Sequence, residues 1–195
     1  MEPLTVLFFG VQGSGKGTQV KLLMEAIKTR SSEAIIHIDM GALLRASLAT
    51  GSVTGKLTGE IINIGKRMPD FMPVYLSTKA FADGIVSNKE HIIADGLCRG
   101  EDQTRGFDDA MVFYGRSNYH VISLELTDAE ATKRLLARGR NDDTPEGIAN
   151  RLAWYKTDVA PQLALMEGRG RAVHRINGDQ SVEAVHADIL KTLGF

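Results

Sequence analysis

Gly10-Val-Gln-Gly-Ser-Gly-Lys-Gly-Thr18 follows directly on the apolar run Leu4-Thr-Val-Leu-Phe-Phe9, and the residues after it have helical spacing. The stretch matches the pattern G-x-x-x-x-G-K-[ST], which forms a phosphate-binding loop when a buried strand precedes it and a helix follows it. Both neighbours are expected here, so the sequence predicts that this loop holds a polyphosphate.

The residue types of this loop suit that role. Glycine lets the backbone approach an anion closely, so that successive N–H groups converge on phosphate oxygens, and the following helix adds its own free N–H groups. Lys16 is placed to reach the outer phosphates, and the Thr18 hydroxyl is placed to contact a bridging Mg²⁺ ion. The alternative is a glycine-rich turn that only joins a strand to a helix.

Length and composition indicate one domain. The chain has 195 residues, a formal net charge of −1 and 24% charged residues. No linker divides it, so we expect a single well-buried core. The near-neutral charge argues against nucleic-acid binding, which needs a basic surface, and favours small-molecule partners.

Neither membrane insertion nor disulfide bonding is expected. The apolar runs have strand length and the N-terminus lacks a secretory pattern, so we expect a cytoplasmic location. Cys98 is the only cysteine, which excludes an intrachain disulfide and a cysteine-based zinc site.

Short apolar runs alternate with longer segments of helical period. Strands are predicted at residues 4–9, 34–38, 91–94, 119–126 and 172–176. Helices are predicted at residues 16–29, 41–50, 56–64, 73–87, 102–114, 128–138, 144–166 and 181–193. Strands without polar alternation are buried on both faces, and helix-length crossovers imply parallel pairing. The pattern predicts an α/β fold, a doubly wound five-stranded parallel sheet flanked by helices.

Three of these helices carry clear start signals. Thr127 precedes an acidic first turn, Thr144 precedes Pro145, and Ser181 stands two residues before an acid, all typical of capped helix N-termini. Ligands of such sheets bind beyond the carboxyl ends of the strands, so polar residues there are candidates for a site.

Polar residues follow the second and third predicted strands. Arg45 and Arg99 could each grip a phosphate through two N–H groups and hold a second phosphorylated ligand, although either alone could be a solvated surface arginine. Asp95 could order water on Mg²⁺, or form a turn with Gly96. Gln103 offers a donor and an acceptor, as reading a base edge requires; alone it would be only a polar residue in the first turn of a helix.

A third group of charged residues lies further along the chain and consists of Arg134, Arg138, Arg140, Asp142, Asp143 and Arg151. Converging guanidinium groups stabilise the negative charge that spreads over oxygens during phosphoryl transfer, and no covalent nucleophile is needed. The alternative is a solvated, charged helix end.

Taken in order, these blocks resemble the adenylate kinase family of nucleoside monophosphate kinases along nearly the whole chain. The loop resembles the family's GxPGSGKGTQ, and residues 95–103 are similar to its DGFPRxxxQ. Residues 140–152 resemble RxDDxxExxxxRL, and Asn177-Gly178 resembles the short turn before the last helix.

The resemblance implies in-line phosphoryl transfer from ATP, with Mg²⁺, to a nucleoside monophosphate, with AMP as the expected acceptor. It implies ATP binding by Gly13, Ser14, Gly15, Lys16, Gly17, Thr18, Arg134, Arg138 and Gln180. The implied AMP-binding residues are Met40, Arg45, Lys66, Arg67, Met68, Gly96, Arg99, Gln103, Arg140 and Arg151. The implied catalytic residues are Lys16, Arg99, Arg138, Arg140 and Arg151, with Thr18 and Asp95 holding Mg²⁺ largely through water. A single kinase domain is expected, with an acceptor-binding insertion at about residues 39–68, working as a monomer.

Two departures from the family pattern bear on function. Asp39-Met-Gly-Ala42 replaces the usual Ser-Thr-Gly-Asp, so a threonine hydroxyl beside the acceptor base is missing. Between Arg138 and Asp142 only Gly139-Arg-Asn141 remain where the family has a lid, which excludes a zinc-bearing lid and leaves a vestige at about residues 138–142. These departures keep two alternatives open: a kinase of UMP, CMP or another monophosphate, and a nucleotide-binding module that has lost transfer.

Overall fold

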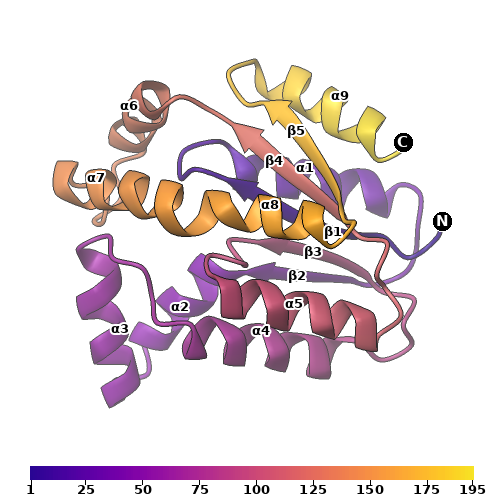
Figure 1. Cartoon of the computed structure of the whole chain (residues 1–195), viewed down its shortest axis with the longest axis horizontal. Helices are drawn as coiled ribbons and strands as arrows, with labels where there is room; N and C mark the ends of the chain where they lie inside the picture. Colours follow the sequence, from indigo (N-terminus) through magenta and orange to yellow (C-terminus); the bar gives the residue numbers. More distant parts are fainter.

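The structure is a computed structural model that describes every residue from Met1 to Phe195. Its centre is a five-stranded sheet in the order β2-β3-β1-β4-β5, in which all neighbouring strands are parallel. Helices cover both faces of this sheet (Figure 1). The strands are β1 (Thr5–Gly10), β2 (Ile35–Asp39), β3 (His91–Asp95), β4 (His120–Glu125) and β5 (Ala172–Asn177). The predicted doubly wound α/β fold is therefore confirmed.

The helices begin and end within a few residues of the predicted positions. They are α1 (Lys16–Lys28), α2 (Met40–Leu48), α3 (Val53–Asn63), α4 (Phe71–Gly84), α5 (Glu101–Phe113), α6 (Asp128–Arg138), α7 (Pro145–Trp154), α8 (Ala160–Gly168) and α9 (Val182–Thr192). The three predicted caps are confirmed, because the side chains of Thr127, Thr144 and Ser181 accept hydrogen bonds from backbone amides in the first turns of α6, α7 and α9.

The helix predicted as one piece at residues 144–166 is interrupted. A π-helical turn, η1 (Tyr155–Val159), separates α7 from α8. Pro161 lies just beyond it and has no N–H to bond to the carbonyl four residues earlier, so the regular ladder is broken there.

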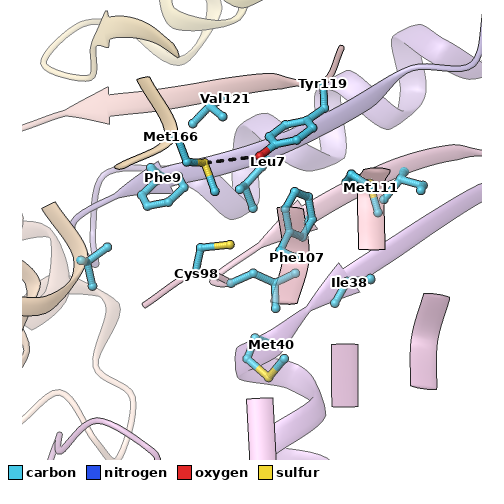
Figure 2. Packing of buried hydrophobic residues seen from close by; sticks show 14 of the residues in the cluster. Leu7, Phe9, Ile38, Met40, Cys98, Phe107, Met111, Tyr119, Val121 and Met166 are labelled. Atoms are coloured by element: carbon cyan, nitrogen blue, oxygen red, sulfur yellow. Dashed lines mark hydrogen bonds between the residues drawn. The ribbon is translucent and has the colours of Figure 1, made fainter. Parts of the chain in front are cut away.

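The apolar residues of the sheet divide between two faces. Leu7 and Phe9 of β1 belong to one core cluster, and Val6 and Phe8, which alternate with them, belong to the other. Figure 2 shows the first cluster. Met40 lies in it with no exposed surface, so its side chain points into the core.

Cys98 also lies in this cluster, fully buried (Figure 2). Burial raises the pKa of its thiol, so the group stays protonated at neutral pH. Its φ of 56° is one that proline cannot adopt, so the backbone of this turn differs from one built on the proline that the resemblance would place here.

The helices α2 and α3 pack on each other and extend beyond the carboxyl edge of the sheet (Figure 1). On the opposite side of this edge, α6 ends at Arg138, Gly139 adopts a left-handed conformation, and Thr144 caps the start of α7. The connection contains no further helix or strand, which agrees with the short segment in the sequence. None of the helices combines the length and apolar character that crossing a bilayer requires.

Candidate nucleotide-binding site

The loop between β1 and α1 presents free backbone donors. The amides of Gly15, Lys16 and Gly17 donate to no protein acceptor, and no side chain caps the start of α1. Gly13 has a φ of 89°, and a Cβ on it would lie 2.9 Å from the carbonyl oxygen of Ala131 in α6, so this position requires glycine. Unpaired N–H groups at a helix N-terminus form a site for an anion, which fits the predicted phosphate loop.

Lys16 lies folded over the same loop. Its Nζ donates to the carbonyl oxygens of Gly10 at 2.7 Å and Val11 at 3.1 Å. Burial lowers the pKa of Lys16 to about 8, and Asp95 opposes that shift. The amine is therefore held in place without a strong anionic partner, next to the free amides.

ATP binding above about pH 8 is expected to cause proton uptake, because phosphate oxygens raise the pKa of a neighbouring amine and Lys16 is mostly neutral there in the free protein. Isothermal titration calorimetry at about pH 9, in two buffers of different ionisation enthalpy, measures the number of protons bound. The Lys16→Met variant should bind none. Equal proton uptake by the variant and the unaltered protein would contradict this assignment.

A cleft of about 1260 Å³ lies between this loop, the ends of β2 and β3, and the α6–α7 connection. Its volume exceeds that of a typical pocket for one small molecule, so it has room for two nucleotides. The predicted residues that line it are Gly13, Gly15, Lys16, Gly17, Thr18, Arg45, Lys66, Asp95, Gly96, Arg99, Arg134, Arg138, Arg140, Arg151 and Gln180.

Four predicted acceptor residues and one loop residue do not line this cleft. Met40 and Met68 are buried in the core, and Arg67 binds Asp70 and Asp158. Gln103 is buried with its amide occupied: Oε1 accepts from the Arg99 amide at 3.1 Å, and Nε2 donates to Asp70 at 2.6 Å. Ser14, in the phosphate loop, is buried too, and its hydroxyl has no protein partner.

Two arginines at the α6–α7 connection share one buried carboxylate. Arg138 donates to both oxygens of Asp143, at 2.9 and 2.7 Å, and Arg151 donates to it at 2.8 Å. Although burial opposes the shift, hydrogen bonds from Arg138 and from the Arg140 amide lower the pKa of Asp143. Arg151 also binds Asp142 at 2.6 Å. The two aspartates thus fix the directions of these guanidinium groups.

Three other arginines in the cleft have no carboxylate partner: Arg45, Arg99 and Arg140. Burial lowers the pKa of Arg140, and the charges of Arg138 and Arg45 lower it further. Positive charges collected in one cleft without acidic partners indicate an anionic ligand.

Asp95 ends β3 directly opposite Asp39, which ends β2. Burial raises the pKa of Asp95, and Lys16 opposes this shift. Its carboxylate and the exposed Thr18 hydroxyl are oxygen ligands of the kind that Mg²⁺ prefers. Nowhere in the chain do three His, Cys, Asp or Glu side chains gather as a metal site.

Several cleft residues were not singled out from the sequence as site residues, namely Gln12, Lys21, His37, Asp39 and Trp154. Asp39 could have been identified from the sequence, because it stands at the end of a predicted strand. In the structure its carboxylate accepts a hydrogen bond from the Ala42 amide at 2.9 Å. Nothing in the sequence marks Trp154 as a site residue, because its place in the cleft depends on the packing of α7.

A parallel sheet whose central strand leads into a phosphate loop, with arginines across the cleft, defines a P-loop nucleotide-binding protein. Residues 8–170 match the family model described as adenylate kinase. Among curated proteins, the chain is 33% identical to "Adenylate kinase 1" of Synechocystis over 95% of both chains, and 33% identical to "Adenylate kinase" of Prochlorococcus marinus over 97% of both. The chain belongs to the adenylate kinase family and is an enzyme of the phosphotransferase class.

Proposed function

We propose that this enzyme transfers the terminal phosphoryl group of ATP to AMP, giving two molecules of ADP by in-line attack. The observation that carries the proposal is the set of three unpaired arginines, Arg45, Arg99 and Arg140, in one cleft with the phosphate loop. The family match and the printed names of the relatives favour AMP over another acceptor and over a module without activity.

The donor half of the proposed site is the loop. Its free amides and Lys16 would bind the ATP phosphates. Arg134 and Gln180 also line the cleft, and they would contact the donor nucleoside. Mg²⁺ supplies charge neutralisation between the phosphates when bound. Thr18 and Asp95 would hold it, largely through water.

The acceptor half consists of the unpaired arginines together with Arg151. They would hold the AMP phosphate in line, while Arg138 and Arg140 stabilise the transferring group. The base would lie near Lys66, Gly96 and Gln103. Gln103 is buried behind the cleft lining, and its amide binds the Arg99 amide and Asp70, so it would act on the base only by holding these two neighbours.

Assays with AMP, GMP, CMP, UMP and the deoxynucleotides as acceptors test this proposal. ADP formation with AMP well above that with the other acceptors is expected. A clear preference for CMP or UMP would contradict AMP as the acceptor and identify a pyrimidine monophosphate kinase. ATP binding without transfer to any acceptor would favour the non-catalytic module.

The short α6–α7 connection is expected to raise ATP hydrolysis relative to transfer. Closure of a lid normally excludes water from this kind of site, and this family's lid is a general example of that role. Here the connection contains no lid element that could cover the cleft. ADP release measured without acceptor checks this, and a rate negligible beside transfer would contradict it.

We further propose that the enzyme works as a cytoplasmic monomer with one kinase domain, an acceptor-binding insertion at about residues 39–68 and a vestigial lid at about residues 138–142, as the family resemblance implies. Sedimentation of the purified protein with and without nucleotides would test the oligomeric state.

A further inference from the structure

One face of α7 contacts the end of the acceptor insertion. Asn150 Nδ2 donates to the Ile64 carbonyl at 2.9 Å, and Trp154 Nε1 donates to the Gly65 carbonyl at 2.9 Å. Between them the two backbones touch, since a Cβ on Gly65 would lie 2.4 Å from the carbonyl oxygen of Gly147. Gly147, Asn150 and Trp154 are three and four residues apart, which places them on one side of the helix.

The two carbonyls that accept these bonds belong to the C-cap of α3 and to the residue that follows it. The last helical residue of α3 is Asn63, and Ile64 is its C-cap. Carbonyls at a helix C-terminus have no partner within the helix and must find one elsewhere. Here α7 provides that partner, so the insertion is attached to the helix that carries Arg151 (Figure 1).

The ring of Trp154 makes a second contact on the cleft side. The Arg99 guanidinium carbon lies 5.4 Å from the centre of this ring, within the range of a cation–π interaction. Arg99 has no acidic partner and lies close over Gly96, where a Cβ would be 2.7 Å from Nη2. The indole is therefore the only aromatic group on which this guanidinium rests.

We propose that Trp154 is a positioning residue for the acceptor: its N–H fixes the end of α3, and its ring holds Arg99 ready for the acceptor phosphate. This role rests on the proposed binding of the AMP phosphate by Arg99. Neither the hydrogen bond nor the cation–π contact of Trp154 involves the phosphate loop. Trp154 shares a small cavity with Gln12 and Lys16 of that loop, but its directed contacts are to Gly65 and Arg99, so its main effect should fall on the acceptor.

Three variants separate the two contacts. Trp154→Phe keeps an aromatic ring and loses the N–H, Asn150→Ala loses only the neighbouring hydrogen bond, and Trp154→Leu loses both N–H and ring. The first two are expected to raise the KM for AMP about 2- to 10-fold, as one net hydrogen bond predicts. Trp154→Leu should raise it by a further factor of about 2 to 10, through the lost stacking of Arg99. In all three variants the KM for ATP should stay within about twofold of the wild-type value.

The control for general destabilisation is Val121→Ala, in the core away from the cleft. It should lower the melting temperature and leave both KM values unchanged. An unchanged KM for AMP in Trp154→Leu, or KM values for AMP and ATP that rise together, would overturn the role of Trp154. A wild-type protein that makes no ADP from AMP would instead refute the proposed function.

Fluorescence provides a readout independent of turnover, because Trp154 is the only tryptophan. AMP added alone to the wild-type protein should change its emission, as phosphate binding to Arg99 alters the charge over the ring. The Arg99→Ala variant should lose that change. An AMP-induced change of equal size in this variant would contradict the coupling between Trp154 and Arg99.

Discussion

Replacing Lys16 by Met is expected to lower kcat for ADP formation by at least about 10²- to 10³-fold, the loss typical of removing one donor that stabilises transition-state charge. Met has similar length and fills the same space without the ammonium. In the structure Nζ lies over the phosphate loop, bonded only to two loop carbonyls, so it can move to phosphate at little cost. A coupled assay of ADP formation from ATP and AMP measures the loss.

The matched control for Lys16 is Lys133→Met on the exposed side of α6, where the side chain is 77% exposed. It should keep wild-type kcat. Thermal unfolding should show that the Lys16 variant is folded, since the substitution removes a buried charge. A Lys16→Met enzyme that keeps more than about a tenth of wild-type kcat would contradict the assigned role, because such a loss is only about 1.4 kcal/mol.

Replacing Arg138 by Ala is expected to reduce kcat by about 10²- to 10³-fold or more, because arginines that stabilise the transferring phosphoryl group contribute that much. Asp143 binds one edge of this guanidinium and thereby fixes its direction at the cleft. Lysine cannot reproduce the two-point contact, so Arg138→Lys should recover little of the rate. Steady-state kinetics with both substrates measure this effect.

The control for Arg138 is Arg175→Ala on β5, an exposed arginine that pairs with Glu125 and Glu167 away from the cleft. Its kcat should match the wild type. Asp143 keeps Arg151 and the Arg140 amide as partners in Arg138→Ala, so the variant should fold. If kcat fell less than about tenfold, Arg138 would serve only the ion pair with Asp143.

The fold followed from the sequence because its signals are local. Five continuous apolar runs alternate with helical segments. Each capping side chain accepts a hydrogen bond from an amide only three residues further along the chain. The carboxyl ends of parallel strands meet at one edge by geometry, so the strand-end residues Asp95 and Arg99 could be assigned to one cleft from the order of the strands and helices alone.

The acceptor side could not be predicted as fully, because it depends on contacts between distant parts of the chain. The direction of Met40 is set by core packing, and Gln103 is held by Asp70, 33 residues away. Trp154 meets Gly65 across 89 residues. None of these contacts leaves a periodic pattern in the sequence. Met40 was expected beside the base, yet its side chain lies in the core.

The burial of Cys98 has a practical consequence for measuring how the cleft moves. A fully buried, protonated thiol reacts slowly with maleimides, so spectroscopic labels can be attached to new cysteines while the native residue stays in place. Leu57 of α3 and Leu136 of α6 are 52% and 51% exposed and lie on the two elements that flank the cleft. A label pair at these positions would follow the separation of the two nucleotide sites during turnover.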